Sequence, residues 1–311
     1  MRQLLEYVGY RLLALIVPLL PRRAAVWLGR RLGALYFVLD PRGRNVAFQN
    51  IRRVFPERKD HAAILLESQR LQAVALLDAL WSRRLSPARA RRHVTIAPAD
   101  EALVRELVAR GRGLLIATAH FGSWEMFNLA VGAMGFPRAT FIARPVRNPR
   151  IDRHLRRMRE RTGNELVYRE DAILKCAGAL RRGEIVCSVI DMAVAPAEGA
   201  IFADFFGAPA MTSAALPALA VRRRAPLLFA VCRPLDKGRS YSIEGRAIPV
   251  REGEDRDAET VRLTRAINEA LEEAVRAHPE AWIWSYKRWK YRPSEDPGAY
   301  PDYALWVHPR W

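Results

Sequence analysis

A histidine and a glutamate five residues apart are the side chains of this chain best suited to proton transfer. His120 and Glu125 lie in the segment ATAHFGSWE, directly after the apolar run GLLIAT at 113–118. On one continuous helix they would point about 140° apart, but a strand-turn-helix junction lets Glu125 fold back onto the imidazole. Glu125 would then accept a hydrogen bond from one ring nitrogen, and the other nitrogen could take a proton from a substrate hydroxyl.

The residues around this pair favour such a junction. An unbroken apolar run is typical of a strand buried on both faces, and ligands bind beyond the carboxyl ends of such strands in open α/β sheets. Gly122 permits a sharp turn, and Ser123 is a candidate N-cap that places Glu125 in the first turn of the following helix. The alternative is a structural histidine that is hydrogen-bonded at a helix N-terminus.

No competing catalytic motif is found along the chain. P-loop, HExxH and GxSxG motifs are absent, and the Gly-x-Gly at 111–113 precedes the apolar run, whereas a dinucleotide fingerprint follows its strand. The cysteines, Cys176, Cys187 and Cys232, are odd in number and widely spaced, so we expect neither a disulfide framework nor a zinc site. We therefore expect no metal and no bound cofactor.

The charge balance predicts an anionic partner. Lys and Arg number 51 against 33 Asp and Glu, which gives a formal net charge of +18. Such a surplus fits phospholipid headgroups, phosphorylated glycolipids, an acidic carrier protein or nucleic acid. Each basic side chain near an anionic membrane contributes roughly 1 kcal/mol of attraction.

The N-terminal segment, residues 1–38, predicts membrane attachment. Its uninterrupted apolar part runs only from Leu12 to Leu20, whereas a single span needs about 20 apolar residues. No small-residue cleavage site follows; a second apolar and basic segment, RRAAVWLGRRLGALYFVL, does. We expect helices that lie in or dip into the bilayer interface. The alternative is two ordinary packed helices.

The rest of the chain predicts the elements that position His120 and Glu125. Residues 39–98 have apolar residues at helical spacing and form a helical lead-in. Beyond residue 100, helical segments alternate with strand-like runs, and a loop follows the strongest run; the runs are 113–118, 139–144, 165–168, 184–191, 226–233 and an edge-like 240–248. This alternation predicts an α/β domain over 39–311, with a mainly parallel central sheet flanked by helices.

The segment GLLIATAHFGSWEMFNLA is similar to the late acyltransferases of lipid A biosynthesis, the lauroyl/myristoyl transferase family, which carry His-x-Gly-x-Trp-Glu after an apolar strand. Four further segments resemble this family in the same order: FIARPVRNPRID, RMRERTGNELVYRED, FADFFGAPAMTSAALPALA and PEAWIWSYKRWKYRP. The broader glycerol-phosphate acyltransferases have Asp in place of Glu125 and a Phe-Pro-Glu-Gly-Thr-Arg block that this chain lacks. The resemblance therefore favours the lipid A branch.

This resemblance implies an O-acyltransferase that moves a fatty acyl chain from a thioester to a hydroxyl of a lipid A precursor. His120 would be the general base and Glu125 would orient it. The donor would be acyl-acyl carrier protein, with acyl-CoA as the alternative. The implied partners are acyl carrier protein, an anionic glycolipid acceptor and membrane lipids, without nucleic acid. The implied location is the cytoplasmic face of the inner membrane of a Gram-negative-type bacterium.

Four residues are candidates for substrate binding. The resemblance implies a helix arginine that contacts the phosphorylated acceptor or the donor; Arg159 matches it best, and neighbouring arginines of that helix compete. A guanidinium binds phosphate with two parallel hydrogen bonds. Asp191 and Arg144 each follow a predicted strand at the edge where His120 is expected, and Asn148 lies in the proline-rich loop after Arg144. The alternatives are a solvated helix face for Arg159 and a cap or turn for Asp191.

The C-terminal segment interleaves aromatic and basic residues. Trp282, Trp284, Trp289 and Tyr291 stand among lysines and arginines. This mixture suits a membrane interface, and it also suits nucleic acid, where bases stack on rings. For Trp282 and Trp284, which are two residues apart, the alternative is a strand that packs on the core.

Two departures from the family pattern leave the acceptor open. Asp191-Met192 stands where family members often have Asp-Gln, and Tyr286-Lys287-Arg288 stands where they often have His-Arg-Arg. One alternative function is therefore acyl transfer to another membrane glycolipid or lipid-linked product. An alternative of another class is a non-catalytic, basic nucleic-acid-binding protein, against which the apolar N-terminus argues.

Overall fold

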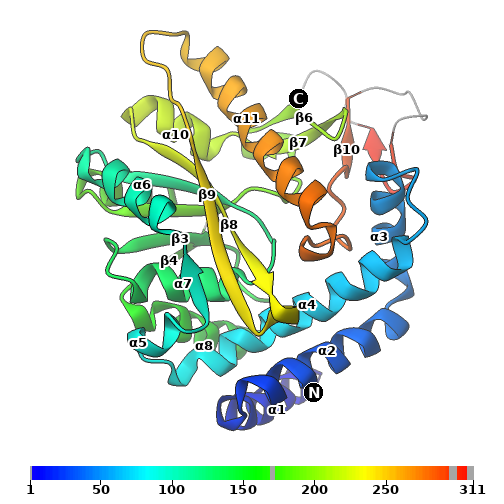
Figure 1. The fold of residues 1–311 in the computed structure, drawn as a ribbon. Coiled ribbons are helices and arrows are strands. Elements are labelled where there is room, and N and C mark those ends of the chain that lie inside the picture. The colour runs from blue at the N-terminus through cyan, green and yellow to red at the C-terminus, as the bar shows by residue number, and fades with distance from the viewer. Residues whose placement is uncertain (1, 169–171, 294–299, 307–311) are drawn as a thin grey trace.

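A seven-stranded sheet forms the centre of the computed structural model, which describes residues 2–168, 172–293 and 300–306 (Figure 1). The strand order is β1-β9-β8-β2-β5-β3-β4. The strands of this sheet are β1 (Val94–Ile96), β2 (Leu114–Thr118), β3 (Ala139–Ala143), β4 (Glu165–Tyr168), β5 (Ile185–Val189), β8 (Leu227–Leu235) and β9 (Ser240–Ile248). All neighbours pair in parallel except β8 and β9. The predicted α/β fold with a mainly parallel sheet is confirmed.

Helices cover both faces of this sheet. The α-helices of the described residues, including those that lie beyond the sheet, are α1 (Arg2–Ile16), α2 (Arg22–Leu39), α3 (Pro41–Val54), α4 (His61–Trp81), α5 (Pro87–Ala90), α6 (Pro98–Ala109), α7 (Trp124–Ala133), α8 (Pro149–Arg159), α9 (Ala172–Arg181), α10 (Ala215–Arg223) and α11 (Arg256–Ala277). In β2, Leu114 and Ile116 pack with α6 and α7, whereas Leu115 and Ala117 pack with α10 and α11. The strand before His120 is thus buried on both faces, as its unbroken apolar run predicts.

Two strand pairs outside the central sheet were not predicted from the sequence. The loop expected after β5 contains an antiparallel hairpin, β6 (Ala200–Phe205) with β7 (Ala208–Ser213), and near the C-terminus β10 (Tyr291–Arg292) pairs with β11 (Leu305–Trp306). The helical lead-in also ends in a strand, β1, which makes β1 and not β9 the edge of the sheet. β1, β10 and β11 are only two or three residues long, so they carry little periodicity of their own and depend on partners farther along the chain.

The N-terminal helices lie against α4 at the edge of the sheet where β8 turns into β9 (Figure 1). Gly33 of α2 lets the two helices approach closely, since a Cβ there would be 2.4 Å from the carbonyl oxygen of Gln69 in α4. Among the described residues, no helix combines the length and the apolar character needed to cross a bilayer. The membrane attachment of residues 1–38, and a division of the chain at residue 38, stay predictions.

Candidate active site

Backbone contacts hold the junction between β2 and α7 in one conformation. The amide of Gly122 donates to the carbonyl of Ala281 at 2.8 Å, and the amide of Ser123 donates to the carbonyl of Cys232 at 3.3 Å. Gly122 has φ +63°, and a Cβ there would lie 1.9 Å from the Cys232 oxygen, so only glycine fits. Ser123 caps α7 as predicted, because its hydroxyl accepts from the amide of Met126 at 3.2 Å.

His120 stands at the end of this strand with its ring held by an aspartate from the neighbouring strand. Nδ1 of His120 is 2.9 Å from Oδ1 of Asp191, and the His120 amide donates to Oδ2 at 2.9 Å. The indole of Trp282 also donates to Oδ2, at 2.9 Å. The Asp191 side chain is 1% exposed and that of His120 22% exposed. Asp191 therefore fixes the ring orientation, and Nε2 of His120 has no hydrogen-bond partner within the described part of the chain.

Glu125 has a different partner from the one the spacing predicts. Arg159 of α8 donates to its carboxylate from Nε at 3.1 Å and from Nη2 at 2.5 Å. The indole of Trp124 donates to the same carboxylate at 3.1 Å. The expected hydrogen bond from the His120 ring to Glu125 is thus made to Asp191 instead. The first turn of α7 directs Glu125 toward α8, whereas β5 lies beside β2 and brings Asp191 to the imidazole.

The charges around His120 and Asp191 favour a protonated, charged imidazole. Burial lowers the pKa of His120, but the charge and hydrogen bond of Asp191 outweigh it, so the pKa is raised above its ordinary value of 6.5. Burial raises the pKa of Asp191, but His120 and the indole of Trp282 lower it by more. The pKa therefore lies below its ordinary value, and this carboxyl is ionised. Glu125 raises the His120 pKa and Arg159 lowers it. An imidazolium that forms during proton transfer is therefore stabilised here.

Two of the predicted substrate-binding residues lie in the loop between β3 and α8. Arg144 is half exposed and donates to Glu198 at 3.3 Å. Asn148 is buried; its Oδ1 accepts from the Arg150 amide at 3.2 Å, and its Nδ2 donates to the carbonyl of Gln3 at 2.8 Å. The Asn148 side chain thus caps α8 and ties it to α1, and a substrate contact of Asn148 stays a prediction. Substrate contacts of Arg144, Arg159 and Asp191 stay predictions.

The C-terminal aromatic residues form part of the core. Trp282, Trp284 and Trp289 are each at most 1% exposed. Arg288 is also buried, and its guanidinium lies 4.8 Å from the centre of the Phe205 ring. The predicted packing of Trp282 and Trp284 on the core is confirmed, but the strand expected there is not present: Trp282 forms an isolated bridge with Phe121, and Trp284 lies outside the strands of the described residues. An interface with membrane or nucleic acid is wrong for the three tryptophans, because their rings are covered by protein.

Two contacts of the site were not foreseen. Trp282 fixes Asp191, and the ring of Trp124 meets the ring of His120 edge-on at 5.1 Å between centroids. Asp191 carried a usable signal, since it follows a predicted strand at the edge where His120 lies. Trp282 carried none, because its contact joins positions 91 residues apart.

The arrangement suits a base that acts on an external hydroxyl. Asp191 holds Nδ1, so the neutral ring can present the lone pair of Nε2 at the carboxyl edge of the sheet. In hydrolytic triads this nitrogen contacts a Ser or Cys nucleophile of the protein. Among the described residues none occupies that position, so the nucleophile would come from a substrate. No group of His, Cys, Asp and Glu in the described ranges could hold a metal ion.

The chain as a whole is similar to proteins of one family. A family model described as bacterial lipid A biosynthesis acyltransferase matches residues 1–291. The lipid A biosynthesis palmitoleoyltransferase of Escherichia coli (strain K12) is 25% identical over 304 residues, 96% of this chain and 95% of the relative. The lipid A biosynthesis lauroyltransferase of the same organism is 25% identical over 309 residues, which cover 96% of this chain and 95% of that relative. Lipid A biosynthesis acyltransferase 2 of Shigella flexneri is 27% identical over 284 residues, 88% and 84%.

Proposed function

This chain belongs to the bacterial lipid A biosynthesis acyltransferase family, and we propose that it transfers a fatty acyl chain from acyl-acyl carrier protein to a hydroxyl of a lipid A precursor. Membership makes the chain an O-acyltransferase that acts on lipid A. The observation that carries the mechanism is the His120 ring, with Nδ1 held by a buried carboxylate and Nε2 unpartnered among the described residues.

In this proposal His120 moves one proton from the acceptor to the leaving group. Nε2 takes the proton as the acceptor oxygen attacks the thioester carbonyl, and Asp191 stabilises the resulting imidazolium. The new C–O bond forms, a tetrahedral oxyanion follows, and the C–S bond then breaks. The imidazolium returns the proton to the carrier thiolate, so the enzyme leaves the cycle unchanged. Such a base typically contributes about 10²–10⁴-fold in rate.

Glu125 and Arg159, which both act on the pKa of His120, would support the same reaction. The hydrogen bonds to Glu125 use Nε and Nη2 of Arg159. Nη1 has no hydrogen-bond partner among the described residues, so it would be available to an anionic oxygen of the substrate, either a phosphate of the acceptor or the oxyanion of the transition state. Glu125 would then act by holding this arginine and by adding negative charge near His120.

The surface supports a membrane-bound acceptor and an acidic donor. The large apolar side chains of α1 and α2 that are exposed to solvent include Leu4, Leu5, Val8, Leu12, Leu15, Trp27, Leu35, Val38 and Leu39. Exposed apolar residues on helices interspersed with arginine fit an interfacial position on anionic lipid. The net charge of +18 fits acyl carrier protein as well as headgroups. We place the enzyme at the cytoplasmic face of the inner membrane.

The test uses the full chain in detergent with acyl-acyl carrier protein and a tetra-acylated lipid A precursor. Product mass is measured for the wild type and for His120→Ala. We expect one added acyl chain in the wild type and loss of that product in the variant. Absence of thioester turnover under every condition would overturn the proposal.

A second candidate acceptor is another membrane glycolipid or lipid-linked product. Met192 favours it, since this residue follows the Asp191 that holds His120 and stands where the family often has Gln. In that case the thioester is consumed in a reaction that depends on His120, without acylation of the lipid A precursor. A panel of hydroxylated membrane lipids would then identify the acceptor by product mass.

A further inference from the structure

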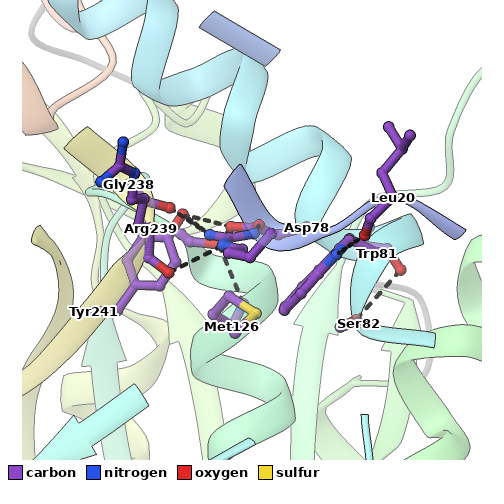
Figure 2. A network of polar contacts seen from close by, with 11 residues as sticks. Leu20, Asp78, Trp81, Ser82, Met126, Gly238, Arg239 and Tyr241 are labelled. Atoms are coloured by element: carbon purple, nitrogen blue, oxygen red, sulfur yellow. Dashed lines mark hydrogen bonds and ion pairs between the residues drawn. The ribbon is translucent and has the colours of Figure 1, made fainter. Parts of the chain in front are cut away.

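A completely buried aspartate links the N-terminal helices to the catalytic turn (Figure 2). Asp78 lies near the end of α4, and its Oδ1 forms an ion pair with Arg22 of α2. Its Oδ2 accepts from the hydroxyl of Tyr241 at 2.5 Å and from the hydroxyl of Ser123 at 2.8 Å. One carboxylate thus joins α2, α4, β9 and the cap of α7.

The charged groups of this cluster are fully engaged. Arg22 also donates to the carbonyls of Gly238 and Arg239, and its guanidinium lies 4.6 Å from the centre of the Trp81 ring. A buried carboxylate of this kind is tolerated only while its partners are in place. Arg22 belongs to the N-terminal segment. Whether the Asp78 carboxylate keeps its ion pair therefore depends on how that segment packs against α4.

The cluster reaches the reaction centre through a single hydroxyl. Ser123 has one hydroxyl hydrogen, and donating it to Asp78 leaves a lone pair for the amide of Met126. The cap therefore has a defined direction, which sets where α7 begins. The next two residues, Trp124 and Glu125, meet the His120 ring and the guanidinium of Arg159.

We propose that Asp78 is a positioning residue, which holds the Ser123 cap and so transmits the docking of the N-terminal helices to the catalytic turn. With Arg22 in place, Asp78 orients the Ser123 hydroxyl, and the first turn of α7 presents Trp124 and Glu125 at the reaction centre. Without Arg22 the carboxylate loses its cation and the cap loses its direction. The inference rests on the proposed acyl transfer, so its test includes a measurement that needs no substrate.

The chain offers a matched control for a merely structural role. Arg30 and Glu67 form a second ion pair between α2 and α4, with contacts of 2.5 and 2.9 Å. The described hydrogen bonds of Glu67 go to Arg30 and Arg70 and do not reach α7. Glu67→Gln therefore weakens the same helix pair without touching the Ser123 cap.

The experiment compares Asp78→Asn, Ser123→Ala, Ser123→Thr and Glu67→Gln in the full chain in detergent. Thermal unfolding, kcat and KM for acyl transfer are measured, together with the pKa of His120 by NMR, assigned by comparison with His120→Ala. We expect Asp78→Asn and Ser123→Ala to lower kcat by about 10- to 100-fold at nearly unchanged KM. Both should also move the His120 pKa, because Glu125 and Arg159 act on it.

Ser123→Thr keeps the hydroxyl and should restore kcat to within about threefold of the wild type. Glu67→Gln should leave both kcat and the His120 pKa at their wild-type values. The inference is overturned if Ser123→Ala changes neither of them, or if Glu67→Gln lowers kcat as much as Asp78→Asn does. If the wild type transfers no acyl chain, the proposed function fails, and the His120 titration still decides the role of Asp78.

Discussion

Asp191 gives the His120 ring a fixed orientation and a raised pKa, two properties that a general base requires. The carboxylate binds the ring nitrogen and the backbone amide of the same residue, so ring and chain cannot turn independently. A third bond from Trp282 holds the carboxylate itself. At the scale of single residues the reaction centre is therefore a buried network, and its pH dependence should follow from it.

We predict that kcat/KM falls as the pH drops through a pKa above 6.5. The folded His120 pKa is raised, so the stability from its ion pair is present below 6.5 and is lost as pH rises through the folded pKa. Activity depends on pH in the opposite direction and rises with pH, because His120 must be neutral to act as a base. Asp191→Asn removes the carboxylate charge, so the acid limb should move to lower pH and kcat should fall by about 10²–10⁴-fold. The pH profile of kcat/KM measures both effects.

An Asp191→Asn variant whose acid limb keeps the wild-type pKa would contradict this account. A suitable control is Asp236→Asn, since Asp236 lies in an exposed turn and pairs with Arg239. This substitution should leave the profile unchanged, because an exposed ion pair contributes little.

The decisive element is the turn between β2 and α7, which bonds to segments far along the chain. Its amides reach the carbonyls of Cys232 and Ala281, so β8 and the segment before Trp282 fix the place of His120. Isolated bridges pair Phe121 with Trp282 and Gly122 with Cys232. Because this turn is held from both sides, it has no room for a side chain at Gly122, where its backbone comes closest to Cys232.

We predict that Gly122→Ala costs at least about 2 kcal/mol of unfolding free energy and abolishes acyl transfer. The new Cβ would meet the Cys232 oxygen at 1.9 Å, and φ there is +63°. Gly111→Ala is the matched control, because its φ is +72° but nothing lies within 4 Å of its Cβ. It should cost about 1 kcal/mol and retain activity. Denaturant unfolding and acyl transfer are measured on both; equal losses would contradict the argument.

At the scale of the whole molecule, the catalytic edge of the sheet and the N-terminal helices lie on the same side (Figure 1). Asn148, at the start of α8, bonds to Gln3 of α1, and His154 of α8 bonds to Tyr10. α1, which carries exposed apolar side chains, therefore packs beside α8, the helix of the arginine that holds Glu125. Contact of this face with a bilayer would bring a lipid acceptor to the reaction centre.

We predict that Leu12→Glu with Leu15→Glu weakens binding to anionic vesicles by about 10- to 100-fold, because two leucines no longer enter the interface and two negative charges are added. These side chains are 55% and 56% exposed, so the fold should tolerate the change. Leu305→Glu is the control, since Leu305 is 55% exposed but lies in β11. Co-sedimentation with phosphatidylglycerol vesicles at two salt concentrations measures binding. Equal binding by the wild type and the double variant would contradict a lipid-facing α1.

Local patterns were sufficient for the parts of the site that lie close together in the chain. The apolar run before His120, Gly122 and the Ser123 cap together predict a strand, a turn and a helix, and the structure has all three. Alternating runs of this kind also predict the mainly parallel sheet. Their physical basis is the periodicity of burial and the backbone needs of a turn, which neighbouring residues determine.

Tertiary structure alone decided which groups meet. Asp191 contacts His120 across 71 positions because β5 pairs with β2, and spacing within the segment pointed instead to Glu125. The arginine expected to bind substrate holds that glutamate, and burial in the core decides between the two alternatives that the sequence left open for Trp282 and Trp284. Strand order and helix packing are set by the burial of the whole apolar surface, and no short segment contains that information.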